Sequence, residues 1–356
     1  MAIIRMYREK LRHNFSHLEK LFTRNNIEWG VVAKLLCGNP LFLRELLDLG
    51  ITEVHDSRVS NLKAIKKLNP AIQTCYIKPP AKRAVKSIVQ YADISFNTQI
   101  ETMRLLSAEA KKQGKVHKVI IMVEMGDLRE GVMGDDLIDF YEQVFEMPNL
   151  EVIGLGTNLN CLHGVMPSKD KLIQLCLYEQ LIEAKFNKHI RWISGGTSVV
   201  IPLLLRKQLP KGVNHFRVGE ALYFGNNLFT GKPFTGMKTD VFKLFAEIIE
   251  LEEKPKVPHG ELAENPSGET FEMEEKDFGK THYRGLLDVG LLDIHPDFLI
   301  PDDPKVKLEA ASSDMLVIDL GDDPGRYKVG DFISFNLKYM GALRLLNSDY
   351  ISKEIV

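Results

Sequence analysis

Short runs of apolar, often β-branched residues alternate with amphipathic stretches through the first 220 residues. Eight such runs lie at about residues 29–34, 52–55, 72–77, 94–97, 116–124, 152–157, 190–193 and 213–217. Between them, segments such as Leu41 to Leu49, Asn61 to Leu68 and Ile100 to Gln113 place apolar residues three and four positions apart, which is typical of helices packed on a sheet. Strands joined by crossover helices pair in parallel, and eight is the number that a (β/α)8 barrel needs.

The alternation by itself does not separate a TIM barrel from a doubly wound open sheet, because both folds repeat strand and helix in the same way. We predict an α/β fold with a (β/α)8 TIM barrel over residues 1–235 and keep the open sheet as the alternative.

The pattern changes after about Thr235. The strand-like runs Val241 to Leu251, His282 to Val289, Met315 to Leu320 and Asp331 to Asn336 are separated by turns rather than helices. They predict a smaller, mostly β C-terminal domain over residues 236–356. Between the first two runs, Lys254 to Lys276 is rich in Pro, Gly and Glu and is expected to form a mobile, solvated acidic loop.

The charge balance argues against large polyanionic partners. The chain has 46 basic and 48 acidic side chains, so no broad basic face is expected for nucleic acid or a membrane surface, and small-molecule chemistry is favoured. Cys37, Cys75, Cys161 and Cys176 form no CxxC pair and no metal-ligand spacing, which fits a reducing compartment without a metal site. The first 20 residues lack a signal-peptide pattern, so a cytoplasmic protein is expected.

Lys34 is the first residue to suggest a chemistry. It ends the apolar run Trp29 to Ala33 and precedes the helix-breaking cluster Cys37 to Pro40. A lysine at the carboxyl end of a buried strand costs free energy, and desolvation lowers the pKa of its ammonium group. The free amine that results is the form that makes a Schiff base with an aldehyde cofactor. A strand-end lysine that extends its amine into solvent is the plainer alternative.

Small residues follow the seventh and eighth predicted strands. Ser194-Gly195-Gly196-Thr197-Ser198 and Gly219-Glu220 leave backbone amides open at two strand ends. Phosphate sites in such barrels commonly lie in the loops after strands seven and eight, although each glycine cluster alone is also compatible with an ordinary turn. A phosphate held opposite a strand-one lysine suggests pyridoxal 5′-phosphate. The cofactor-binding residues predicted on this basis are Lys34, Ser194, Gly196, Thr197, Ser198, Gly219 and Glu220.

Several segments, taken in order, resemble one family. They are Val32-Ala33-Lys34, Asp56-Ser57-Arg58 with Asn61, Val123 to Gly131, Gly156 to Asn160, Ser194 to Ser198, Arg217 to Tyr223 and Ala311 to Asp314. Over almost the whole chain they are similar to the alanine racemase fold type (fold type III) of pyridoxal phosphate enzymes, most closely to its ornithine/alanine racemase-like branch. The resemblance implies a racemase that interconverts the L- and D-enantiomers of a free amino acid. It also implies a head-to-tail homodimer in which each β domain completes the partner's active site.

The resemblance also implies roles for single residues. Lys34 matches the Schiff-base lysine, which serves as acid and base on one face of the substrate. Arg217 matches an arginine that hydrogen-bonds the pyridine nitrogen, where its fixed charge opposes protonation and favours racemisation over transamination. Arg129 matches the arginine near the phenolic oxygen and the substrate carboxylate, and Tyr339 the tyrosine that meets the phosphate. A surface cation for Arg217, an ion-pair network around Arg129 and a packed Tyr339 are the structural alternatives.

One position departs from the family. In Leu287 to Asp293, Leu291 stands where alanine racemases have the tyrosine that acts on the second face of the substrate. We therefore include Asp293 with Lys34 and Arg129 among the predicted catalytic residues. The other candidates for the second base are Tyr283, His295, Cys161 and His163.

The substrate is predicted from charge alone. Acidic residues expected near the mouth, among them Glu124, Asp127, Glu220 and Asp293, would suit the terminal amine of a basic amino acid, with ornithine as the first guess and alanine also possible. Two other functions stay open. One is a lyase or decarboxylase with the same cofactor, and the other is a non-catalytic protein that binds the cofactor or an amino acid.

Overall fold

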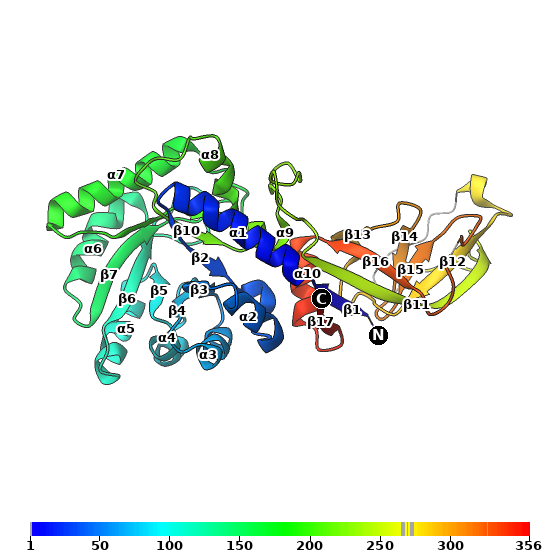
Figure 1. Cartoon of the computed structure of the whole chain (residues 1–356), viewed down its shortest axis with the longest axis horizontal. Helices are drawn as coiled ribbons and strands as arrows, with labels where there is room; N and C mark the ends of the chain where they lie inside the picture. The colour runs from blue at the N-terminus through cyan, green and yellow to red at the C-terminus, as the bar shows by residue number, and fades with distance from the viewer. Residues whose placement is uncertain (1, 265–267, 269, 271–273, 326) are drawn as a thin grey trace. The chain divides into compact units, whose positions relative to one another are not determined.

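The computed structural model describes residues 2–264, 268, 270, 274–325 and 327–356. The chain divides into two compact units (Figure 1). One unit is Arg8–Val241, and the other combines Met1–Tyr7 with Phe242–Val356. Among the described residues, no helix has the length and apolar character needed to cross a bilayer.

The first unit is a closed parallel barrel. Its strands are β2 (Glu28–Val32), β3 (Glu53–Asp56), β4 (Gln73–Tyr76), β5 (Ile94–Asn97), β6 (His117–Met122), β7 (Leu150–Gly156), β8 (Trp192–Ser194), β9 (Gly196–Thr197) and β10 (His215–Val218). They follow the order β8-β7-β6-β5-β4-β3-β2-β10-β9. Since β9 continues β8 after a single glycine, its pairing with β10 closes the ring. The barrel prediction is confirmed, and the open-sheet alternative is wrong.

Helices surround the barrel strands (Figure 1). They are α1 (Arg8–Arg24), α2 (Pro40–Leu47), α3 (Val59–Leu68), α4 (Val85–Tyr91), α5 (Ile100–Lys112), α6 (Leu137–Phe145), α7 (Lys169–Phe186), α8 (Ile201–Leu205) and α9 (Glu220–Phe224). Helix α2 illustrates how the sequence sets a boundary. The Asn39 side chain accepts a hydrogen bond from the Leu41 amide, and Pro40 occupies the first turn, where its missing N–H costs nothing.

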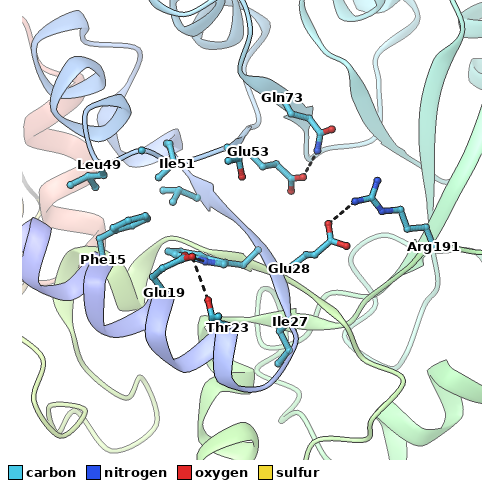
Figure 2. Close-up of a pocket in the computed structure, with 14 residues that line it drawn as sticks. Phe15, Glu19, Thr23, Ile27, Glu28, Leu49, Ile51, Glu53, Gln73 and Arg191 are labelled. Atoms are coloured by element: carbon cyan, nitrogen blue, oxygen red, sulfur yellow. Dashed lines mark hydrogen bonds and ion pairs between the residues drawn. The ribbon is translucent and has the colours of Figure 1, made fainter.

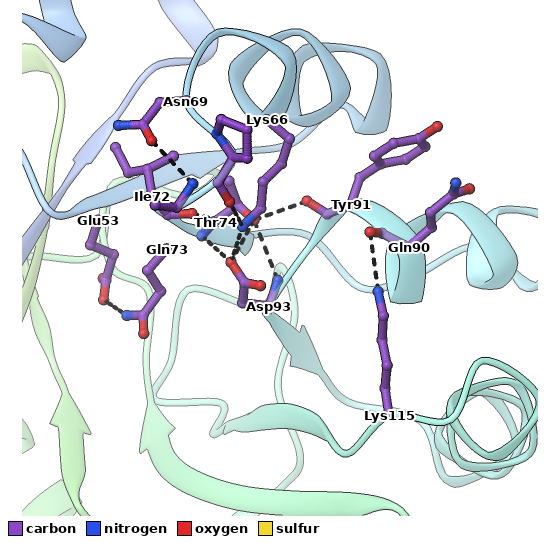
Figure 3. A network of polar contacts seen from close by, with 12 residues as sticks. Glu53, Lys66, Asn69, Ile72, Gln73, Thr74, Gln90, Tyr91, Asp93 and Lys115 are labelled. Carbon is purple, nitrogen blue, oxygen red and sulfur yellow. Dashed lines mark hydrogen bonds and ion pairs between the residues drawn. The ribbon is translucent and has the colours of Figure 1, made fainter.

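Polar side chains connect the amino-terminal ends of β4 and β5 (Figure 3). The Asp93 carboxylate accepts hydrogen bonds from the Thr74 amide at 2.8 Å and from the Lys66 ammonium at 2.7 Å. Gln73 donates to Glu53 at the start of the neighbouring strand β3. These contacts lie at the amino-terminal end of the barrel strands. In barrels of this kind, residues at that end usually contribute to stability.

The second unit is mostly antiparallel β. Its elements are β1 (Ile3–Met6), β11 (Phe242–Pro255), β12 (Thr281–Leu287), β13 (Leu299–Pro301), β14 (Lys307–Ala311), β15 (Leu316–Asp319), β16 (Phe332–Leu337), α10 (Tyr339–Asn347) and β17 (Ser352–Ile355). The main sheet has the order β13-β16-β11-β12-β15-β14, and β1 pairs with β11 and with β17. The predicted β domain is thus present.

The structure assigns the first residues differently from the sequence analysis, which placed residues 1–235 in the barrel. Strand β1 pairs antiparallel with β11, from Ile3 opposite Phe245 to Met6 opposite Phe242. In the predicted acidic loop 254–276, residues 256–264 form neither helix nor strand. Residues 265–267, 269 and 271–273 of that prediction lie outside the described residues.

Candidate active site

Lys34 lies in a turn at the carboxyl end of the barrel. Strand β2 ends at Val32, and Lys34 begins a single 3-10 turn, Lys34–Leu36. The residue is exposed, so the burial that the sequence predicted for it is wrong in this chain. Lys34 is exposed because strand β2 ends two residues before it. The turn that begins at Lys34 is no longer part of the barrel wall. The Lys34 amine is therefore accessible to a ligand without any unfolding.

Two carboxylates respond to the charge of Lys34. Asp56 ends the adjacent strand β3, and burial raises its pKa to about 6 against the opposing effects of hydrogen bonds and of Lys34. Glu220 begins α9 after the last strand, and burial raises its pKa to about 7, again opposed by Lys34. Asn61 donates to the Asp56 carboxylate at 3.1 Å. The strands that lead to these two carboxylates, β3 and β10, flank β2 on either side, and Lys34 favours the ionised form of both carboxyl groups.

The two glycine-containing loops lie side by side, as the sequence predicted. Strand β9 pairs with β10, with Thr197 opposite Arg217, and the Ser198 hydroxyl accepts a hydrogen bond from the Ala221 amide at 3.1 Å. A Cβ atom on Gly219 would lie 3.1 Å from the Cβ of Val32, so this turn passes directly beside the end of β2. The loop after the last strand is thus next to the segment that carries Lys34.

Arg217 is a buried cation held by neutral oxygens. Its Nη1 donates to the Ser194 hydroxyl at 2.6 Å and to the Ser194 carbonyl, and its Nη2 donates to the Thr157 carbonyl at 2.7 Å. Burial lowers its pKa to about 10, so the side chain stays charged at neutral pH. Only 5% of the residue is exposed, which excludes the surface-cation alternative.

Arg129 forms an ion pair within the protein, which was the structural alternative given for it in the sequence analysis. Its guanidinium binds the Glu130 carboxylate through Nε and Nη2, and Asn158 donates to the same carboxylate at 2.9 Å. Asp127 instead organises the following loop, since it accepts backbone hydrogen bonds from Cys161, Leu162, His163 and Val165. In this structure Arg129 is thus paired within the protein.

Asp293 and Tyr339 belong to the second unit. The Ser348 hydroxyl donates to the Asp293 carboxylate at 2.7 Å. Tyr339 begins α10 and is partly buried. The Leu291 amide donates to the Ser312 carbonyl at 2.9 Å, which keeps the Leu287 to Asp293 segment beside the Ala311 to Asp314 segment. Among the predicted barrel residues, the contacts above join Thr197, Ser198, Arg217 and Gly219 to one another or to the end of β2. Asp293 and Tyr339 are described only within the second unit.

Sequence reasoning missed a cluster inside the barrel. Glu53, His55 and His215 are buried, and each offers one ligand atom within 4.8 Å of the others, a set that could hold a metal ion although no metal site was expected. Glu53 and His215 are separated by 162 positions, so spacing could not pair them. The sequence signal that could have indicated this cluster was the charged residue Glu53 near the start of the apolar run 52–55.

The comparisons with known proteins agree with the motifs. The alanine racemase, N-terminal domain model matches residues 7–227. The ornithine racemase of Acetoanaerobium sticklandii is 36% identical over 98% of this chain and 97% of its own length. The lysine racemase of Thermotoga maritima is 27% identical over 97% of this chain and 96% of its own length.

Solved structures share the fold. Alanine racemase from Bartonella henselae with covalently bound pyridoxal phosphate superposes with a TM-score of 0.75 at 16% identity, covering 100% of this chain and 99% of that one. Alanine racemase from Streptomyces coelicolor gives the same TM-score, 0.75, and covers 98% of that chain. With its family model and a full-length relative at 36% identity, this chain belongs to the alanine racemase N-terminal domain family.

Proposed function

We propose that this protein is a pyridoxal phosphate-dependent racemase of a basic free amino acid, with ornithine as the first substrate to test. The observation that carries the proposal is an exposed lysine at the mouth of the first barrel strand, beside two carboxylates and the turn after the last strand. The ornithine and lysine racemases match nearly the whole chain, which supports a basic amino acid rather than alanine.

The residues of the barrel mouth fit the cofactor. A side chain at Gly196 would collide with the Phe216 ring, with a Cβ only 2.1 Å from it, so only glycine fits where β9 pairs with β10. Lys34 would hold the aldehyde carbon and Arg217 the ring nitrogen. The phosphate would be held by Gly196, Thr197, Ser198, Gly219, the backbone of Glu220 and, from the second unit, Tyr339. The predicted contact from Ser194 does not fit, because its hydroxyl is buried between Arg217 and His215. When bound, the cofactor supplies an electron sink that acidifies the α-proton of an amino acid.

The protein groups then act on protons. Lys34, once released by the incoming amino acid, is the acid and base on one face of the α-carbon. Asp56 and Glu220, with pKa values of about 6 and 7, lie in the range where each can balance the charge of the lysine as it gains or loses a proton. Arg217 offers only donors, so it opposes protonation of the ring nitrogen and disfavours transamination. Arg129 would leave Glu130 to bind the substrate carboxylate.

The second face of the substrate needs a group from the β domain. We assign this role to Asp293, because Leu291 has no titratable group and Asp293 lies two residues away in the same segment. The domain would come from the partner of a head-to-tail cytoplasmic homodimer, and it would exclude water from the mouth.

Two measurements on the cofactor-loaded protein test the proposal. Incubated in D₂O with a panel of L-amino acids, it is expected to incorporate deuterium at the α-carbon and to abolish optical rotation with ornithine and lysine ahead of alanine. Deuterium exchange that leaves one enantiomer in lasting excess would indicate a lyase or decarboxylase. Release of an amine or aldehyde product would indicate the same. Cofactor absorbance without exchange on any amino acid would indicate a binding protein and would contradict the proposal.

A further inference from the structure

Buried hydrogen bonds run through the barrel from Arg217 to the opposite end of the strands. Arg217 Nη1 donates to the Ser194 hydroxyl at 2.6 Å, and that hydroxyl lies 2.7 Å from His215 Nδ1. His215 Nε2 lies 2.9 Å from Glu53 Oε1. Glu53 begins β3, at the edge of a cavity of about 590 Å³, where it meets Gln73 (Figure 2).

The chemistry of Glu53 sets the direction of these bonds. Three nitrogen atoms lie within hydrogen-bond distance of its two oxygens, which is the environment expected of an ionised carboxylate that only accepts. An ionised carboxylate only accepts, so the Nε2 atoms of both histidines donate to it, as does the Gln73 amide. If His215 is neutral, its Nδ1 accepts from the Ser194 hydroxyl, whose oxygen accepts from Arg217. Every donor then points toward Glu53.

The environment of His55 fits a neutral imidazole at that position. Its Nδ1 has no hydrogen-bond partner among the described residues, and the ring is completely buried. A proton on that nitrogen would be an unsatisfied buried donor, which costs more than a bare lone pair. The charges at the two ends are then one guanidinium and one carboxylate.

Another carboxylate competes for the role of counter-charge. Glu130 also acts on Arg217, since it raises the pKa of the guanidinium, although burial lowers that pKa more. Glu130, however, is bound by the guanidinium of Arg129 and by the Asn158 amide. Its charge is therefore already balanced, whereas the donors on Glu53 are two imidazoles and an amide. A buried cation that lacks a counter-charge is strongly disfavoured.

We propose that Glu53 is the counter-charge of Arg217, connected to it through His215 and Ser194, and is a positioning residue that holds the guanidinium charged and oriented at the cofactor end of the barrel. The connection is a property of the chain without cofactor. Only its consequence for the reaction rests on the function proposed above.

The barrel contains its own reporter for the test. The chain has two tryptophans, and Trp192 is buried with its ring stacked on His215 at 4.1 Å between centroids. In a Trp29→Phe background, the fluorescence of Trp192 therefore follows unfolding of the barrel. Urea unfolding of cofactor-free protein is measured for the background, for Glu53→Gln, for Arg217→Met and for both together. Such a cycle isolates the coupling between the two sites.

We expect Glu53→Gln to lower the urea midpoint strongly in the protein that retains Arg217. In the Arg217→Met background, the same substitution is expected to lower the midpoint by at most half as much. Equal losses in both backgrounds would overturn the proposal, because Glu53 would then matter only as an acceptor for its immediate neighbours. The control is Glu28→Gln, which removes a carboxylate from the same cavity but pairs at 2.8 Å with Arg191. Coupling of Glu28 to Arg217 as strong as that of Glu53 would likewise overturn it.

A second variant covers the case in which neither protein with Glu53→Gln folds. Ser194→Ala keeps every charge and removes the bridging hydroxyl. Its effect on the midpoint is expected to be larger when Arg217 is present, because His215 loses its Ser194 partner in both backgrounds. An equal effect beside Arg217→Met overturns the proposal. Metal content is measured on the same preparations. One equivalent of zinc that copurifies and is lost in His55→Gln would make Glu53 a metal ligand and would also overturn it.

The reaction provides a separate measurement. In the cofactor-loaded protein, Glu53→Gln is expected to lower kcat several-fold while KM changes little, because Arg217 would hold the cofactor and not the substrate. An unchanged kcat would remove the positioning role. If the unmodified protein racemises no amino acid, the function proposed above fails, while the urea cycle still decides whether Glu53 balances Arg217.

Discussion

The Tyr223 hydroxyl donates a hydrogen bond to the Val32 carbonyl at 3.2 Å. This bond connects the helix after the last barrel strand to the final residue of β2, two positions before Lys34. Gly219, at the start of the same helix, also passes close to Val32. The lysine is therefore held at a fixed place relative to the loops that we assign to phosphate binding, although its own side chain is exposed.

Lys34→Ala should abolish both the absorbance of the covalently bound cofactor and all turnover, because no other amine occupies its position at the end of β2. The absorption spectrum after reconstitution and dialysis measures the first effect, and α-deuterium exchange the second. Lys78→Ala is the matched control, since Lys78 is exposed and follows the end of β4 by two residues, as Lys34 follows β2. Retention of absorbance and turnover in Lys34→Ala would discard the cofactor assignment.

The stability of the cofactor-free barrel should fall as the pH rises from about 4.5 to about 7. Burial raises the Glu220 pKa from 4.5 to about 7, so the folded state favours the protonated form. Its contribution is fully present below pH 4.5 and is lost as the pH rises through about 7, which amounts to at most about 3 kcal/mol. Glu220→Gln is expected to unfold at the same urea concentration as the unmodified protein at pH 4.5 and at a higher one at pH 8. A variant less stable at pH 8 would contradict this account.

Arg217→Gln should raise transamination relative to racemisation. The amide keeps a donor for the Thr157 carbonyl but loses the fixed charge that opposes protonation of the ring nitrogen. The ratio of keto acid formed to enantiomer formed measures the change, with Arg217→Lys as the control that keeps the charge. The same ratio in all three proteins would refute the role of the charge. We expect Arg217→Glu to destabilise the barrel instead, because a carboxylate would face the Ser194 and Thr157 carbonyls.

Gly196→Ala should destabilise the barrel by roughly 1–3 kcal/mol, because the added methyl overlaps the Phe216 ring. Reconstitution with cofactor should weaken as the loop moves. Combined with Phe216→Leu, which makes room, the same substitution is expected to cost less than it does alone. Urea unfolding followed by fluorescence checks both statements. If the two substitutions are simply additive, the collision with Phe216 is not the reason that position 196 has a glycine.

The barrel could be predicted from the sequence because its signals are local. Each predicted strand in the first 220 residues corresponds to an observed one, since buried parallel strands are continuous apolar runs and crossover helices such as α2, α3 and α5 are amphipathic. Strands β1, β13, β14 and β17 were not predicted. Strand β17, Ser-Lys-Glu-Ile, has no apolar run, and it forms because β1 pairs with it. Pairing between distant segments overrides local preference in such short strands.

The family, the alternation of strands and helices, and the positions of Lys34 and the two glycine loops can be read from the amino acids alone, because each depends on neighbouring residues. The exposure of Lys34, the burial of Arg217 and the contact of Glu53 with His215 across 162 positions follow from the fold. Their common cause is ring closure. Closing the barrel places the last strand beside the first, and that contact determines which charges lose water and which partners they find.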